Sequence, residues 1–145
     1  MEEQPMLLGD HWKEMVTKWA GGENYHLHTE DDGALYFHFG GADRVVQIKL
    51  APEGRWINLT ATDDRYLQEE HIPRAIGAAN AWNFRFRRPA AAVVLPDGDA
   101  PAWLSWSFDM DGHAEYTEEA FATLIETAIS VLLKAFSWLG KEHDL

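Results

Sequence analysis

Apolar and polar residues alternate along this chain with two periods, and the period predicts which segments are helices and which are strands. In the first segment, apolar side chains recur at the spacing of one helical face, at Trp12, Met15, Val16, Trp19 and Ala20. Asp10 is a suitable N-cap. Gly21-Gly22 ends the segment, because glycine adopts the left-handed C-terminal conformation without steric cost. The pattern predicts an amphipathic helix over residues 10–22.

The following segments alternate with the two-residue period of β-strands. Strand-like runs at 25–30 and 34–39 meet at Asp31-Asp32-Gly33. A three-residue loop with a left-handed Gly33 would pair Glu30 with Ala34. That register separates the apolar side chains of the hairpin from a second face that carries His26, His28, Tyr36 and His38. Further strands are predicted at 44–50 and 56–61.

The period then returns to that of a helix. Pro73 suits a first helical turn, and Ile76, Ala79 and Trp82 form the predicted apolar face of a thin helix that ends at Asn83. Strands are expected at 90–95 and 103–110, and Thr117 is the expected cap of a last helix that stops at Gly140. The predicted order is α-β-β-β-α-β-β-α. Because hairpins join most strands, we expect a single α+β domain over residues 1–145, with a largely antiparallel sheet flanked by helices.

Composition narrows the classes of partner. The 145 residues include 12 Lys and Arg, 24 Asp and Glu and no cysteine, with a net charge of −12. This charge has the wrong sign for nucleic acid or an anionic membrane surface. The absence of cysteine excludes thiolate metal sites and fits a cytoplasmic protein. The apolar stretch at 128–133 is far shorter than the roughly 20 residues of a membrane span, and the N-terminus lacks the pattern of a signal peptide.

The element order, together with Asn80-x-Trp82-Asn83 at a helix end, resembles the YbjN family of candidate bacterial sensory transduction regulators. Members of that family are similar to type III secretion chaperones in fold. The resemblance runs from about Asp10 to Gly140 and is most specific over residues 73–95, with the helix start at Thr117-Glu118-Glu119 as a second anchor. It implies a small cytoplasmic protein, often dimeric and without a cofactor. The family has no agreed catalytic residues to transfer, and this chain departs from it in its many Trp and His residues.

The histidines suggest one candidate site. The predicted register brings His26 opposite His38, with His28 beside them and Glu30 as the nearest acid. Transition metals favour such clusters, although a zinc site normally needs three or four ligands in tetrahedral geometry. The alternative interpretation is an ordinary exposed polar face. A metal-dependent or small-molecule-binding protein that uses this face is therefore the second functional hypothesis.

No Ser-His-Asp arrangement, glycine-rich phosphate loop or convincing carboxylate pair is present, so we expect no enzyme and no cofactor. The arginines at 85, 87 and 88 supply three of the twelve basic residues. They could receive an acidic partner segment, or pair with acidic residues of the same chain or of a second copy in a dimer.

Surplus aromatic and apolar residues favour protein binding. Trp56 and Trp103 fall on strand faces opposite the predicted core, and the last helix is apolar nearly all round. The alternative is that helices cover both faces of the sheet. The leading hypothesis is a chaperone- or adaptor-like binding module with a regulatory role, as a homodimer or a heterodimer with a paralogue. Its predicted partner-binding residues are Trp56, Trp103, Val131, Leu132, Leu133, Trp138, Arg85 and Arg87.

Overall fold

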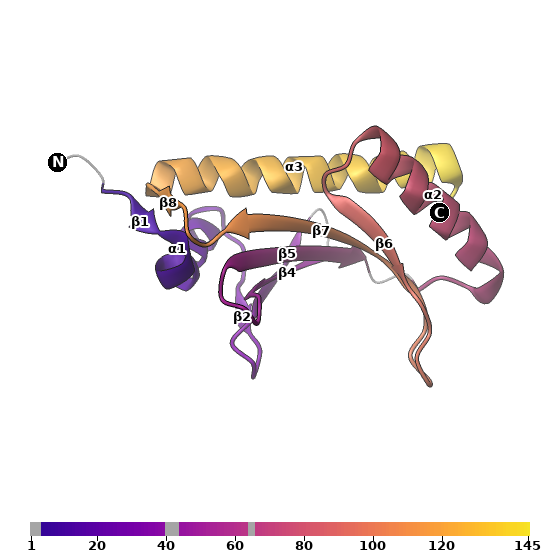
Figure 1. Cartoon of the computed structure of the whole chain (residues 1–145), viewed down its shortest axis with the longest axis horizontal. Helices are drawn as coiled ribbons and strands as arrows, with labels where there is room; N and C mark the ends of the chain where they lie inside the picture. The colour runs from indigo at the N-terminus through magenta and orange to yellow at the C-terminus, as the bar shows by residue number, and fades with distance from the viewer. Residues whose placement is uncertain (1–3, 40–43, 64–65) are drawn as a thin grey trace.

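The computed structural model describes residues 4–39, 44–63 and 66–145, which form an antiparallel sheet with helices packed on one face (Figure 1). The helices are α1 (Leu8–Gly22), α2 (Ile72–Arg85) and α3 (Glu118–His143), and a 3₁₀ turn, η1 (Glu69–His71), precedes α2. The six-stranded sheet has the order β2-β3-β4-β5-β7-β6. Its strands are β2 (His28–Thr29), β3 (Leu35–Phe39), β4 (Arg44–Leu50), β5 (Trp56–Asp63), β6 (Ala90–Val94) and β7 (Trp103–Asp111). A separate pair joins β1 (Met6–Leu7) to β8 (Glu115–Tyr116).

The predicted register of the first hairpin is confirmed. The Glu30 N–H donates to the Ala34 carbonyl at 2.8 Å, and Gly33 has a φ of +89°, in the left-handed region. The first arm is shorter than predicted, because β2 covers only His28–Thr29. The predicted order counted three strands between the first two helices, whereas the structure has four, β2 to β5.

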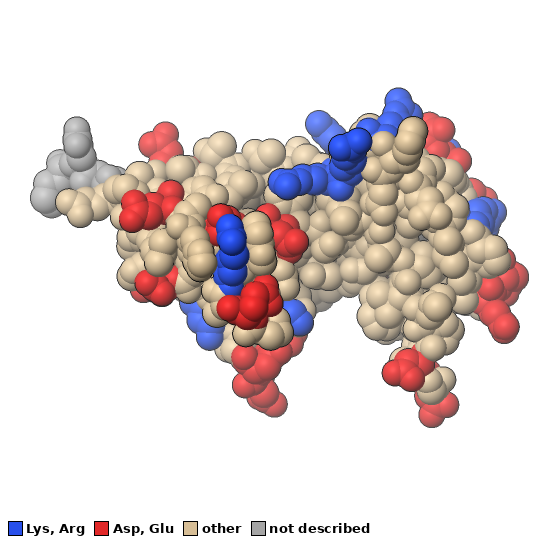
Figure 2. Space-filling view, in the orientation of Figure 1, with Lys and Arg blue, Asp and Glu red and all other residues tan. Residues whose placement is uncertain are grey.

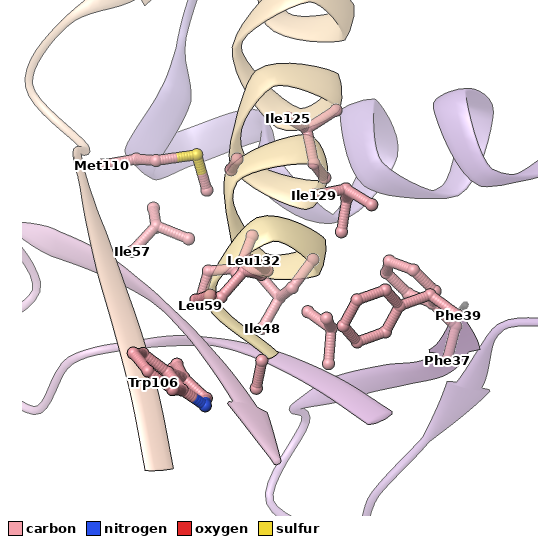
Figure 3. Packing of buried hydrophobic residues seen from close by; sticks show 14 of the residues in the cluster. Phe37, Phe39, Ile48, Ile57, Leu59, Trp106, Met110, Ile125, Ile129 and Leu132 are labelled. Atoms are coloured by element: carbon pink, nitrogen blue, oxygen red, sulfur yellow. The ribbon is translucent and has the colours of Figure 1, made fainter. Parts of the chain in front are cut away.

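One face of the sheet carries the core. The register aligns Phe37, Val46, Ala61 and Trp106 across four neighbouring strands, and all four are buried. Figure 3 shows other side chains of this face, Ile48, Leu59 and Met110, on the side of the sheet toward Ile125, Ile129 and Leu132 of α3. Helices α1 and α2 reach the same face, since Trp19 contacts Phe37 with ring centroids 5.6 Å apart and Trp82 contacts Trp106 at 5.2 Å.

The opposite face of the sheet carries no helix among the described residues. Its side chains alternate with those of the core and are mainly polar, including Gln47, Asn58, Thr60, Ser105 and Ser107. The hypothesis that helices cover both faces is therefore wrong. A helix packed on this side would bury hydroxyl and amide groups without offering them partners.

Helix α3 is the longest helix of the described residues, and it carries a stripe of core side chains. By length and composition its 26 residues could cross a membrane, which the prediction from residues 128–133 did not anticipate. In the structure, eight of its residues are buried against the domain. They are Phe121, Ile125, Ala128, Ile129, Leu132, Ala135, Phe136 and Leu139. The apolar stripe thus serves as the core of an α+β fold that is compatible with a soluble protein.

The helix ends depart from the predictions by a few residues. Thr117 caps α3 as expected, since its hydroxyl accepts a hydrogen bond from the Ala120 N–H at 3.1 Å. The helix continues past Gly140 to His143. Helix α1 begins at Leu8, so Asp10 lies in its first turn and does not cap it. Local capping signals locate helix ends only approximately, because packing can extend a helix by a turn.

Candidate protein-binding surface

Helix α2 has a buried face made of three alanines and Trp82, and an outward face on which apolar residues are exposed. Its buried residues are Ala75, Ala78, Ala79 and Trp82, which allow close contact with β6 and α3. Its exposed residues are Pro73, Ile76, Gly77, Asn80, Ala81 and Phe84, together with the charged Arg74 and Arg85. Phe84 is 90% exposed and Ile76 40% exposed. Because positions 76, 80 and 84 are four residues apart, they lie along one line of the helix.

The exposed Ile76 contradicts its predicted place in the core of α2. The residues that are buried instead are alanines, since the space between the helix and the sheet admits only small side chains beside Trp82. Ala78 is completely buried at this contact. Gly77 is on the open side of the helix, because a Cβ placed on this glycine would meet no atom within 4 Å.

Trp82 and Asn83 hold α2 in place on the sheet. The Trp82 indole N–H donates to the Pro89 carbonyl at 2.7 Å, and the ring contacts Trp106 and Trp138, both with centroids 5.2 Å away. The Asn83 amide donates to the Ala91 carbonyl at 2.9 Å and accepts from the Ala91 N–H at 2.8 Å. Asn83 therefore binds the free edge of β6 as a neighbouring strand would, and α2 continues to Arg85 beyond it.

Arginines gather where α2 turns into β6. Arg85, Arg87 and Arg88 are exposed, and Figure 2 shows blue side chains clustered over this connection. The Arg85 guanidinium lies 4.9 Å from the centroid of the Phe86 ring, and that of Arg88 lies 5.9 Å from Phe108. Arg87 adopts a left-handed backbone with a φ of +66°.

The salt bridges between described residues are His11–Glu14, Lys18–Glu118 and Arg55–Asp111. None of the three clustered arginines pairs with a carboxylate within the part of the chain that the structure describes. Pairing with acidic residues of the same chain, one of the predicted alternatives, is therefore not found among the described residues. An acidic partner segment and a second copy of the chain remain as predictions.

The two exposed-face tryptophans do not form a single surface. Trp56 is 37% exposed and Trp103 is half-buried, both on the sheet face opposite the core, as predicted. Trp56 pairs with Asp111, which lies eight residues along β7 from Trp103. At about 3.4 Å per strand residue, the two tryptophans are separated by roughly 27 Å along the sheet.

The residues predicted for partner binding on α3 are largely structural. Leu132 is completely buried, so its placement on a binding surface is wrong. Leu133 and Trp138 pack against the core, Trp138 also meets the Phe86 ring at 6.3 Å, and Val131 is half-buried. These positions are covered because α3 lies on the sheet with α1 and α2 both in contact with it.

The histidines come together as the register predicted. The His26 and His28 rings lie 4.5 Å apart, His28 stacks on Tyr36 at 4.8 Å, and His38 lies 6.4 Å from His28. Across the described residues, however, no three His, Asp or Glu side chains form a group that could hold a metal ion. Glu30, the expected acidic ligand, accepts hydrogen bonds from Gln47 at 3.0 and 3.1 Å. The geometry favours ring packing over metal coordination.

The structure contains a cavity that the sequence did not predict. It has a volume of about 440 Å³ and lies between α1 and the start of α3, with Met15, Trp19 and Phe121 among its lining residues. At its rim, Lys18 pairs with Glu118 at 2.5 Å. The cavity joins residues about a hundred positions apart, so no local motif could have revealed it.

No protein-family model and no curated protein sequence matches this chain. Solved structures do match. The crystal structure of YbjN, a candidate transcription regulator from E. coli, is similar with a TM-score of 0.70 and 14% identity, over 90% of this chain and 92% of that one. An uncharacterized protein from Methanothermobacter thermautotrophicus is similar with a TM-score of 0.57 and 11% identity, over 90% of this chain and 98% of that one. At these identities the likeness shows the fold alone, and the expected YbjN-like α+β fold is confirmed.

Proposed function

We propose that this protein is a non-enzymatic binding module that holds a segment of another protein against the outward face of α2. The observation that carries this proposal is Phe84, which is 90% exposed on α2 beside the exposed and uncharged residues Ile76, Asn80 and Ala81. Burying a phenylalanine side chain contributes about 1.5–3 kcal/mol. Aromatic side chains of this kind are the usual anchors of protein interfaces.

The anchoring of α2 supports this function. Because Trp82 and Asn83 fix the helix to β6 through three side-chain hydrogen bonds, its outward face is formed before a partner arrives. A preformed surface loses little conformational entropy on binding. This arrangement suits chaperone- or adaptor-like work in the cytoplasm, in which a helical segment lies against an apolar surface. The likeness to a candidate transcription regulator is consistent with a regulatory setting.

Assembly into a homodimer, or into a heterodimer with a paralogue, is the second part of the proposal. Size-exclusion chromatography with light scattering on the purified chain is the direct measurement. A mass of one chain at high concentration would exclude the homodimer.

The binding function is tested by capture from the native cell with three baits: the wild-type chain, Phe84→Ser and Leu95→Ser. Leu95 is 60% exposed and directly follows β6, so it is a matched apolar control outside α2. We expect specific partners on the wild type and on Leu95→Ser, and their loss on Phe84→Ser, with equal thermal stability for the three. Partners that persist on Phe84→Ser would contradict the proposed use of α2.

A further inference from the structure

We infer that the partner of the α2 surface is an acidic amphipathic helix, which places carboxylates on Arg85, Arg87 and Arg88 and an apolar side chain over Gly77, beside Ile76 and Phe84. This inference rests on the proposed function and names the chemistry of its partner. It depends on two separate features of the surface, its charge and its shape.

The charge around α2 differs in sign from that of the whole protein. Arg74, Arg85, Arg87 and Arg88, four of the twelve basic residues, lie within or directly after α2, although acids outnumber bases by 24 to 12 in the chain. All four are exposed. None of them forms a salt bridge with a carboxylate of the described residues, although the chain is acidic. Their guanidinium groups are therefore available to a carboxylate of another molecule. Two of them are held over aromatic rings, which leaves the guanidinium edge free for bidentate binding.

The shape of the surface fits a helix. Ile76 and Phe84 are eight residues apart, which corresponds to about 12 Å along the helix axis. Asn80 lies between them on the same line of the helix. On the adjacent line, Gly77 and Ala81 present almost no side chain, and the space above Gly77 is open. Small residues allow another backbone to approach closely, while Ile76 and Phe84 border the approach on one side. An apolar side chain from a partner helix would therefore lie over Gly77, with its acidic side toward the arginines.

Two other occupants fit less well. Nucleic acid requires several phosphate contacts to offset repulsion by a chain of net charge −12, and this surface offers four arginines. A second copy of α2 would bring the same four arginines against themselves. Glu69 and Glu70 of the adjoining η1 could offset two of these four positive charges, so self-pairing would place the remaining arginines against one another.

The test is a selection from a displayed library of amphipathic helical peptides with randomised charged positions, using the folded full chain as bait. We expect the recovered peptides to be predominantly acidic. Their binding, measured by fluorescence anisotropy, should weaken by about tenfold or more in the triple variant Arg85→Glu, Arg87→Glu, Arg88→Glu. The control triple variant Lys13→Glu, Lys49→Glu, Arg55→Glu alters exposed residues of α1, β4 and the turn before β5 and changes the net charge equally; α1 and α2 lie at opposite ends of the domain (Figure 1). It should remain within roughly threefold of wild type, since distant exposed charges are screened by salt.

Each other outcome overturns the inference. Recovered peptides that are neutral or basic, or that ignore the arginine variant, would contradict an acidic partner, while Phe84-dependent capture from cells would leave the proposed function intact. Binding of a single-stranded oligothymidine that is lost in the arginine variant would assign the surface to nucleic acid. A doubled mass that falls to one chain in Phe84→Ser would assign it to a second copy. A library that yields no binder would exclude the docking surface.

Discussion

Helices α2 and α3 are both rich in apolar residues, but they use them in opposite ways. Helix α3 carries the longer apolar stripe and buries it against the sheet, with α1 and α2 beside it. Helix α2 buries mostly alanine and leaves Phe84 and Ile76 outside. The amount of apolar surface on a helix therefore does not indicate whether it binds a partner. What matters is how many neighbours cover it.

This comparison predicts that substitutions in α3 act mainly on stability and those on the outward face of α2 mainly on binding.

The largest effect is expected for Leu132→Ala, which removes a completely buried side chain of α3. The free energy of unfolding should fall by about 2–5 kcal/mol. Urea denaturation followed by circular dichroism measures it. Val131→Ala, at a half-buried neighbour, should cost clearly less, and equal losses at both positions would contradict the assigned faces of α3.

Asn83→Ala should have the next largest effect, because it leaves the Ala91 N–H and C=O on the edge of β6 without their partner. The expected loss is about 1–3 kcal/mol in the free energy of unfolding. Asn80→Ala, on the exposed side of the same helix, should change stability by less than about 0.5 kcal/mol. Hydrogen exchange at the Ala91 amide offers a local readout, and unchanged protection in Asn83→Ala would count against the edge contact.

The two helices also differ in how their N-termini are capped, and this difference predicts a smaller effect on stability. Thr117 caps α3 with its hydroxyl, whereas His71 at the start of α2 makes no side-chain capping bond. Thr117→Ala should therefore lower the free energy of unfolding by about 1 kcal/mol. His71→Ala should have little effect, which thermal denaturation of both variants would check. A larger loss at His71 would show that the start of α2 depends on that side chain.

Phe84→Ser should have the smallest effect on stability and a large effect on binding. Since the ring is 90% exposed, the free energy of unfolding should change by no more than about 0.5 kcal/mol. Affinity for the selected acidic peptides should fall about tenfold, as for the loss of an interface anchor. Anisotropy titrations with the variant and with Leu95→Ser compare the two exposed residues directly. An equal loss of peptide affinity in Leu95→Ser would contradict a specific role of α2 in binding.

Features set by near neighbours in the chain were predictable. The turn at Gly33 and the alternation around it led to the correct hairpin register, and the Thr117 cap located the start of α3. The grouping of His26, His28 and His38 followed from that register. The chemistry of the group did not, because metal coordination depends on side-chain directions that periodicity leaves open.

Features set by distant contacts were not predictable in the same way. Ile76 and Leu132 are both aliphatic residues on the predicted faces of helices, yet one is exposed and the other completely buried. Asn83 looked like a helix terminator, but its amide binds a strand eight residues further on. No local pattern distinguishes these cases.

The sequence by itself determined the period of each element, the hairpin register and the α+β class, because these depend on steric and solvation preferences of residues close together in the chain. Only the tertiary structure decided which apolar residues remain exposed. That outcome depends on where α2 and α3 lie on one sheet, and alanines at the α2–sheet contact bring the helix close while leaving Phe84 on the outside. The candidate binding surface is thus a consequence of packing between segments far apart in the sequence.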